Sequence, residues 1–237
     1  MTDTTRHIST QFDEELNEVR DASLTMAREV QQQLSDAIRA IATGDRELAN
    51  QVLSNDSRIN ELEVDIDNAC TQLIARRQPT ARDLRQIITT FRTIGDLERI
   101  GDESKKIARV ANKTFSSEEK HLLASLENFA ETVLEMLRTV LQAFTELDAD
   151  SALDVHYFDK KIDRQYEAML RQLMTHMMED PSSVPKIMDV VFSARALERI
   201  GDRCKNIAEY VIYKVHGQDV RHASRSTMKA LLRDNDE

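Results

Sequence analysis

The sequence predicts an all-α protein in which six long helices form two related halves. Residues that interrupt helices are scarce, because the 237-residue chain contains only five glycines and three prolines. Apolar residues recur at helical spacing along nearly the whole chain. The hexapeptide LERIGD occurs at 97–102 and again at 197–202, which indicates an internal duplication. We therefore expect two antiparallel three-helix bundles related by a pseudo-twofold axis.

Five interruptions of the helical pattern separate the expected helices. They lie at Gly44-Asp45, 78–80, 116–119, Leu147-Asp148 and 180–183. The third has the serine-glutamate spacing of a capping box, which is typical of a helix start. The resulting six helices are expected at 8–42, 46–77, 81–113, 118–146, 149–178 and 184–216.

The two halves align over most of their length. The second and fifth helices match with an offset of 103 residues, and the third and sixth with an offset of 100. The difference falls in the proline-containing loops, where changes of length are tolerated. Short connections make neighbouring helices antiparallel. We predict a first repeat at 1–115, a second repeat at 116–217 and a polar, loose tail at 218–237.

Charge and cysteine content limit the class of protein. The formal net charge is -10, which disfavours nucleic acid and favours cationic partners, either metal ions or a basic protein surface. The two cysteines, Cys70 and Cys204, are too few for a disulfide framework and lack metal-ligand spacing, so we expect buried thiols. No apolar leader and no apolar run of about 18 residues is present. These features predict a cytoplasmic protein.

Each LERIGD copy carries two carboxylates on one helix face. Glu98 and Asp102 are four residues apart, as are Glu198 and Asp202, so the members of each pair lie one above the other. Both pairs continue an apolar stripe, where aliphatic residues are the usual choice. Carboxylates that are even partly buried require a counter-charge or a metal ion.

Two arrangements satisfy these carboxylates. One is a salt-bridge network, and the other is a cation site, which the repetition of the pair on equivalent faces favours. The basic residues available for a network are Lys105, Lys106, Lys205, Arg99 and Arg199.

A second acidic stripe lies one helix earlier in each repeat. Asp56 and Asn60 share a face in the first repeat, and Asp159 and Asp163 share the equivalent face in the second. If these faces meet the LERIGD faces, each repeat gathers a set of oxygen ligands. Such a set suits a hard cation such as magnesium, manganese, calcium or ferric iron. Glu63 continues the first stripe, and we expect it on a solvated face.

A methionine cluster lies near the end of the fifth helix. Flexible methionine side chains usually fill irregular gaps in a core, so we expect this cluster to be buried. Its members are Met169, Met174, Met177 and Met178.

These motifs resemble those of the PhoU family of phosphate-uptake regulators over about residues 7–222. The pattern LERIGDxxKxIA occurs in both repeats, with DxxIN at 56–60 and DxxID at 159–163. Three further stretches carry the resemblance: IARRQPT at 74–80, RQLMTHMMED at 171–180 and GDRCKNI at 201–207.

The resemblance implies two three-helix bundles in a cytoplasmic, homodimeric protein that represses phosphate-uptake signalling without being an enzyme. Its partners would be the ATPase subunit of a phosphate ABC transporter and a sensor histidine kinase. Some members bind iron or other metal ions through a repeated E(D)xxxD motif. The matching pairs here are Glu98/Asp102, Glu198/Asp202 and Asp159/Asp163. Asn60 replaces the second carboxylate of the remaining pair, so equal affinity of the two sites is not implied.

Two other functions remain open. A carboxylate-rich helical bundle is also the framework of di-iron enzymes, which need two E-x-x-H motifs, whereas this chain has one at 118–121. The second open function is a helical adaptor that binds no metal. The sequence has no Gly-rich phosphate loop, GxSxG or HExxH motif, which favours an adaptor over a catalyst. It shows no anion pocket either, so we expect the transporter to sense phosphate.

Overall fold

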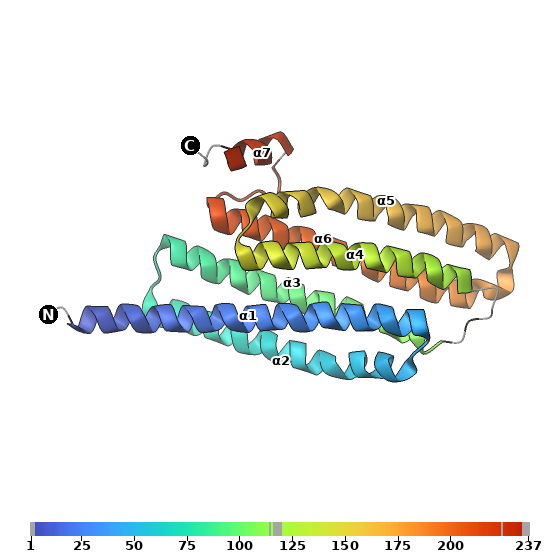
Figure 1. The fold of residues 1–237 in the computed structure, drawn as a ribbon, viewed down its shortest axis with the longest axis horizontal. Helices are drawn as coiled ribbons and strands as arrows, with labels where there is room; N and C mark the ends of the chain where they lie inside the picture. The colour runs from blue at the N-terminus through green and yellow to red at the C-terminus, as the bar shows by residue number, and fades with distance from the viewer. Residues whose placement is uncertain (1–2, 114, 116–119, 224, 234–237) are drawn as a thin grey trace.

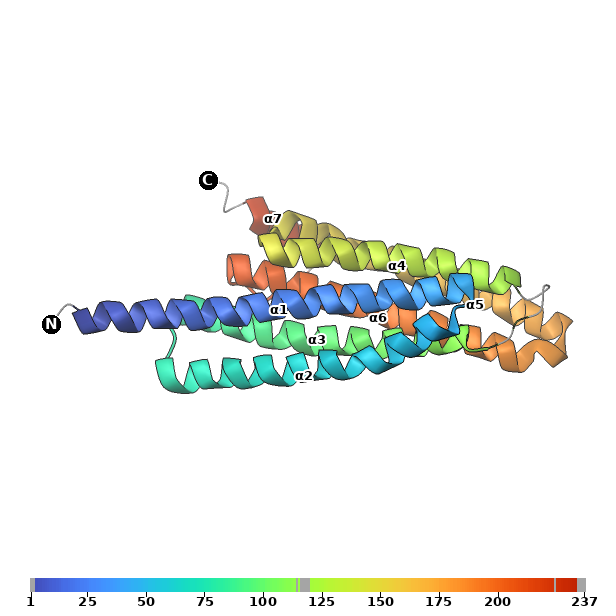
Figure 2. The same ribbon diagram turned by 60° about the horizontal axis from the view of Figure 1, so that its bottom comes forward.

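The computed structural model describes residues 3–113, 115, 120–223 and 225–233. Its helices lie in two groups of three (Figures 1 and 2). The first group is α1 (Asp3–Thr43), α2 (Arg46–Arg77) and α3 (Ala81–Ala111). The second is α4 (Lys120–Glu146), α5 (Ala149–Glu179) and α6 (Val184–His216), with a 3-10 turn, η1 (Pro181–Ser183), before α6. The predicted all-α architecture is confirmed, and the helix start expected at 116–119 lies outside the described residues.

The same capping device begins the middle helix of each repeat. Asp45 accepts a hydrogen bond from the Leu48 amide at 3.0 Å, which caps α2. Asp148 accepts from the Ser151 amide at 3.1 Å at the equivalent start of α5. The residues just before these caps adopt the left-handed conformation, Gly44 in the first repeat (φ 67°) and Leu147 in the second (φ 59°).

α3 and α6 form the centre of the molecule and join the two repeats. They make the most extensive contact of any helix pair. Lys113 pairs with Asp189 at 3.4 Å, and Asp96 pairs with Arg203 at 3.4 Å, so the two helices run antiparallel. With this register, the two LERIGD segments lie opposite each other. The buried aliphatic residues of both repeats form one continuous core, which includes the unpaired thiols of Cys70 and Cys204.

The tail differs from its prediction. Gly217 ends α6 in the left-handed conformation, and the chain then forms another helix, α7 (Arg225–Arg233). Val220 and Met228 are buried, and the Met228 sulfur lies 4.0 Å from the Tyr157 hydroxyl of α5. The expectation of a loose tail is therefore wrong for this part, because its few apolar side chains dock on the second repeat.

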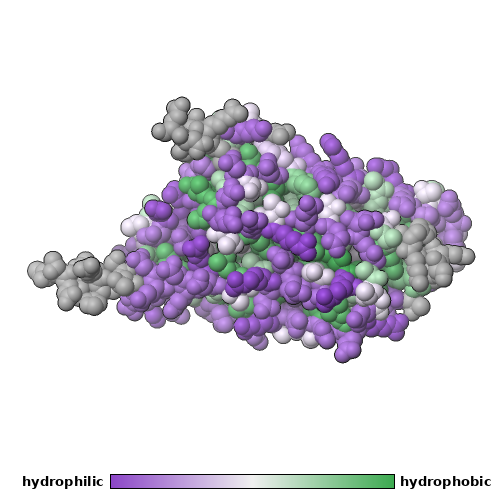
Figure 3. Space-filling model, viewed as in Figure 1, coloured by the Kyte–Doolittle hydropathy of each residue, from purple (hydrophilic) through white to green (hydrophobic). Residues whose placement is uncertain are grey.

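The face of the molecule seen in Figure 3 is mostly hydrophilic. Within the described residues, no helix is both long and apolar enough to cross a membrane. The methionine cluster is divided, since Met169 is buried but Met174 and Met178 are 62% and 75% exposed. The expectation of core packing is wrong for these two, because they lie on the solvent side of α5.

Candidate functional site

The two LERIGD glycines allow the central helices to approach their neighbours closely. A Cβ atom on Gly101 would lie 3.3 Å from Ile59 Cδ1 and 3.6 Å from Asp56 Oδ1 of α2. A Cβ atom on Gly201 would lie 3.0 Å from Ile162 Cγ2 of α5. A side chain at either position would require the contacting isoleucine to shift. The glycines therefore bring the acidic faces of α2 and α5 against the LERIGD faces.

The first carboxylate cluster is organised around Asp56, which is 5% exposed. Lys105 Nζ lies 2.6 Å from both Asp56 Oδ2 and Asp102 Oδ1, so one ammonium group bridges α2 and α3. Gln33 of α1 donates to Asp56 Oδ1 at 3.4 Å and to the Gly101 carbonyl at 3.0 Å. Asn60 also donates to Asp56 Oδ2, at 3.3 Å. This aspartate therefore has both a counter-charge and amide donors.

The second cluster is organised around Asp159, which is also 5% exposed. Lys205 Nζ lies 2.8 Å from Asp159 Oδ2. When α1 and α4 are aligned at their C-terminal ends, Met136 of α4 occupies the position of Gln33 and offers no amide donor. Asp163 stands where Asn60 stands in the first repeat. The second cluster thus has one more carboxylate and fewer neutral donors than the first.

In the first cluster, neighbouring carboxylates act on the pKa of Glu98. Burial raises the pKa of Glu98, and Asp102, Glu63 and Asp56 add to the effect by repulsion. The expected solvated role of Glu63 is therefore incomplete, because its charge acts on this cluster. The acidic faces meet, as the sequence predicts.

Repulsion is also present in the second repeat. Burial raises the pKa of Glu198, with Asp202 and Asp163 contributing in the same direction. Burial is the largest cause that raises the pKa of Asp202, and the negative charges of Asp159 and Asp163 add to it. The pKa of Asp163 rises through burial and the charge of Asp159. A raised carboxyl pKa means that the site favours an added positive charge or a proton.

The donor set and the present geometry give different answers on metal binding. Hard oxygen donors are present in both clusters, and Glu198 Oε2 is buried without a hydrogen-bond partner. Among the described residues, however, no three carboxylate, histidine or cysteine side chains are placed to hold one ion. The cations observed in the clusters are the ammonium groups of Lys105 and Lys205 and the guanidinium of Arg195, which lies 2.7 Å from Glu198 Oε1. A metal ion would have to displace these lysines, so the residue types fit a cation but the present arrangement is a salt-bridge network.

The remaining basic residues behave in different ways. Lys106 and Arg199 both contact Glu103, at 2.8 and 3.3 Å, so Arg199 bridges from α6 to α3. Arg99 instead pairs with Asp96 of its own helix, at 3.5 Å. Sequence reasoning missed Glu103 and Gln33, which are polar residues on otherwise apolar faces. A single polar residue on an apolar face was the sequence signal that could have identified them.

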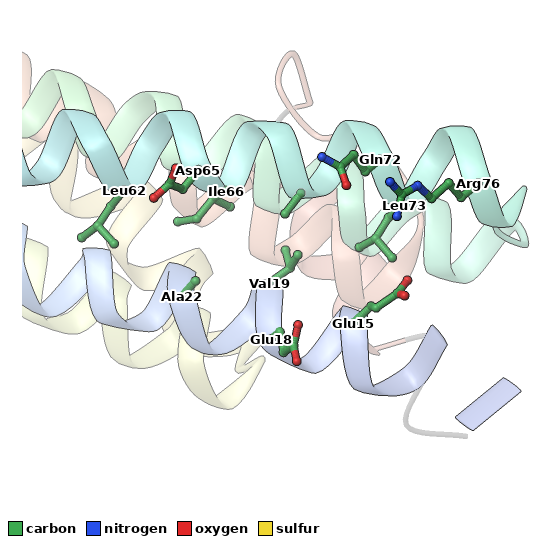
Figure 4. A pocket seen from close by; sticks show the side chains of 11 residues that line it. Glu15, Glu18, Val19, Ala22, Leu62, Asp65, Ile66, Gln72, Leu73 and Arg76 are labelled. Carbon is green, nitrogen blue, oxygen red and sulfur yellow. The ribbon is translucent and has the colours of Figure 1, made fainter. Parts of the chain in front are cut away.

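A separate hollow of about 390 Å³ lies between α1 and α2 (Figure 4). Val19, Leu62 and Ile66 give it an apolar floor, and Glu18 and Asp65 give it an acidic rim. Among the lining residues that the structure describes there is no cysteine, serine or histidine to act as a nucleophile or a base. The single E-x-x-H motif of the di-iron alternative begins at residues outside the described structure.

Comparison with known proteins gives consistent matches over the whole chain. The PhoU domain model matches twice, at residues 24–111 and 126–211, once in each repeat. The phosphate-specific transport system accessory protein PhoU of Serratia marcescens is 48% identical over 227 residues, which cover 96% of this chain and 93% of that protein. The protein of the same name from Escherichia coli (strain K12) is 47% identical over 231 residues, covering 98% and 96%.

Two solved structures share the fold. The crystal structure of PhoU from Pseudomonas aeruginosa has a TM-score of 0.82 and 42% identity, and the match covers 87% of this chain and 100% of that one. The phosphate transport system regulatory protein PhoU from Streptococcus pneumoniae has a TM-score of 0.78 and 29% identity, covering 88% and 99%. The relatives are named as accessory or regulatory proteins and not as enzymes.

Proposed function

The chain belongs to the PhoU family, and we infer from this membership that it is a regulatory accessory protein of a phosphate transport system. In finer detail, we propose that it is an adaptor which contacts the ATPase subunit of the phosphate ABC transporter and the sensor histidine kinase of the phosphate regulon. Repression of phosphate uptake and of the regulon would follow from these contacts. The adaptor acts in the cytoplasm as a homodimer.

Exposed apolar side chains on a polar surface are the observation that carries the adaptor proposal. Phe91 is 49% exposed and Phe192 is 63% exposed, on the two central helices. Met174 and Met178 are 62% and 75% exposed and lie four residues apart on α5. Large apolar groups on a soluble surface mark contact sites, and methionine adapts to the shape of its partner.

We also propose that the two carboxylate clusters bind metal cations that set the geometry of docking. The raised pKa values of Glu98, Glu198 and Asp202 support this, because burial and then neighbouring carboxylates disfavour their charged forms, and a bound cation offsets both effects. The ligands would be Glu98 and Asp102 with Asp56 in the first repeat, and Glu198 and Asp202 with Asp159 and Asp163 in the second. A hard ion such as iron, manganese, magnesium or calcium suits these donors.

A crosslinking experiment tests the adaptor proposal. The chain would be crosslinked to the transporter ATPase and to the kinase in cells grown at high and low phosphate. We expect crosslinks to both partners, with a pattern that changes with phosphate, and loss of repression when Met174 and Met178 are changed to Lys. The absence of crosslinks to either partner at both phosphate levels would contradict the proposal.

A four-site variant tests the role of the clusters. Changing Glu98, Asp102, Glu198 and Asp202 to Ala should reduce both bound metal and phosphate-dependent repression. The matched control removes four exposed glutamates instead, at Glu29, Glu61, Glu131 and Glu179. Normal metal content and repression in the cluster variant would leave the metal-free adaptor as the correct function. Oxygen consumption by the iron-loaded protein would instead support the di-iron alternative.

A further inference from the structure

A groove between the two repeats lies where the end of α3 packs beside the start of α6. It has a volume of about 510 Å³ and is unusually basic for a chain of net charge -10. Its five basic lining residues are Lys106, Arg109, Lys113, Arg195 and Arg199. Two carboxylates, Glu103 and Asp189, also line it. We call this site the inter-repeat groove.

The two carboxylates do not neutralise the groove. Lys106 and Arg199 share Glu103, and Lys113 pairs with Asp189 at 3.4 Å. Arg109 has no carboxylate within 4 Å among the residues that the structure describes. Arg195 pairs with Glu198 outside the lining, at 2.7 Å. Five cations against three carboxylates leave a local excess of two positive charges. The excess is held in a concave site, where charge attracts small counter-ions most strongly.

The duplication provides an internal comparison for this groove. Because α3 and α6 are related by an offset of 100 residues, every groove residue has a counterpart at the other end of the same helix pair. Four groove cations have no cationic counterpart: Lys106 corresponds to Asn206, Arg109 to Glu209, Lys113 to Tyr213 and Arg195 to Gly95.

The other end of the helix pair is filled by a polar network. Asp96 is 2% exposed there and is contacted by Arg203 at 3.4 Å and by Asn206 at 3.5 Å. The guanidinium of Arg92 stacks over the Tyr210 ring at 5.8 Å. The basic character is thus confined to one end of a symmetric scaffold, so packing of α3 on α6 does not account for it.

We propose that the inter-repeat groove binds a small phosphorylated anion, of the pyrophosphate or nucleoside diphosphate class. The excess of two positive charges attracts such an anion. Arginine forks and lysine ammonium groups are the side chains best suited to phosphate oxygens. Ser193 lies in the lining, and its hydroxyl is buried without a hydrogen-bond partner, so it offers one more donor.

Phe192 should distinguish a nucleoside diphosphate from pyrophosphate. Its ring lines the groove and is 63% exposed, so a nucleobase has a face on which to stack. Pyrophosphate has no such group. Since α3 and α6 belong to different repeats, either ligand would connect the repeats and stabilise the folded chain. This inference does not depend on the regulatory function or on metal binding.

Titration calorimetry of the full chain with pyrophosphate and with ADP tests the proposal. EDTA in the buffer removes divalent metal ions, so that the carboxylate clusters do not contribute. The test variant K106N/R109E/K113Y copies the residues found at the other end of the helix pair. The control R39E/R171E lowers the formal charge by the same amount at two exposed sites outside the groove.

We expect saturable binding of both ligands, with an affinity that falls at high salt. Orthophosphate should bind more weakly than either ligand, and acetate should give no binding signal. The triple variant should lose at least about tenfold in affinity, and the control should match the parent. F192A should weaken ADP but not pyrophosphate. No saturable binding by the parent, equal losses in the control, or unchanged affinity in the triple variant would each overturn the proposal. R109E alone supplies the same test if the triple variant does not fold.

Discussion

The two carboxylate clusters occupy equivalent places in the two repeats but satisfy their buried aspartates differently. Asp56 has Lys105, Gln33 and Asn60 as donors. For Asp159, Lys205 is the one side-chain donor within the described residues. The duplication has therefore kept the acidic faces while the supporting donors diverged. Asp159 therefore depends more than Asp56 on a single positive charge, and this difference leads to the predictions below.

Removing the central lysine should have the largest effect, and it should be greater in the second repeat. K205M leaves Asp159 buried without its counter-charge, and we expect a loss of about 3 kcal/mol in the free energy of unfolding. K105M should cost about 2 kcal/mol, because Gln33 and Asn60 still donate to Asp56. Urea unfolding of both variants measures the difference. A larger loss in K105M would contradict the comparison.

Exchanging the divergent donors tests the role of Gln33. Q33M introduces the residue of the second repeat and leaves the Gly101 carbonyl without this donor, so it should cost about 1–2 kcal/mol. The reverse change, M136Q, places an amide near Asp159 and should make K205M less destabilising in the double variant. Urea unfolding of the single and double variants gives this coupling energy. Additive effects of M136Q and K205M would show that the amide does not reach the aspartate.

The acidic pairs predict an unusual dependence of stability on pH. Burial, with Asp202 and Asp163, raises the pKa of Glu198 above its ordinary 4.5, so the folded chain holds this proton more tightly than the unfolded chain. The contribution of Glu198 to stability therefore increases as the pH falls through the raised pKa, and is lost above it. E198Q should raise stability at pH 7 by less than about 1 kcal/mol and flatten the profile above pH 4.5. The control E61Q, at an exposed site, should change neither the stability at pH 7 nor the shape of the pH profile.

The turns before the two middle helices predict a smaller effect. Leu147 adopts the left-handed conformation that Gly44 adopts in the first repeat. This backbone conformation is energetically unfavourable for a residue with a Cβ atom. L147G should therefore stabilise the chain by about 0.5 kcal/mol, after the greater flexibility of unfolded glycine is deducted. Thermal unfolding measures the change. A decrease in stability would mean that packing of the Leu147 side chain outweighs the backbone strain.

Much of the fold could be predicted from the sequence, because its signals are local. Helical periodicity and the Asp45 and Asp148 caps define most helix ends within a few residues. The tail was predicted wrongly because Val220 and Met228 are two isolated apolar residues in a polar segment, which give no periodic pattern. Their burial depends on a surface that only the folded second repeat provides.

The candidate site was predictable in its acidic residues but not in its balance of charge. The four-residue spacing places Glu98 with Asp102 and Glu198 with Asp202, and the meeting of their faces with α2 and α5 follows from the duplication. Whether Lys105 reaches two aspartates while Lys205 reaches one depends on side-chain geometry. The basic groove was missed because its cations come from α3 and α6, whose antiparallel register no single segment reveals.

Manganese binding by metal-free protein tests most directly the central claim that the duplicated motif forms two unequal cation sites. The bound metal would be counted per chain for the parent, D163N and N60D, with electron paramagnetic resonance reporting the free ion. We expect the tighter site to be lost in D163N and retained in N60D, with N60D tightening the first-repeat site by about tenfold. No bound manganese in the parent, or identical binding curves for all three proteins, would contradict the claim and leave the clusters as salt-bridge networks.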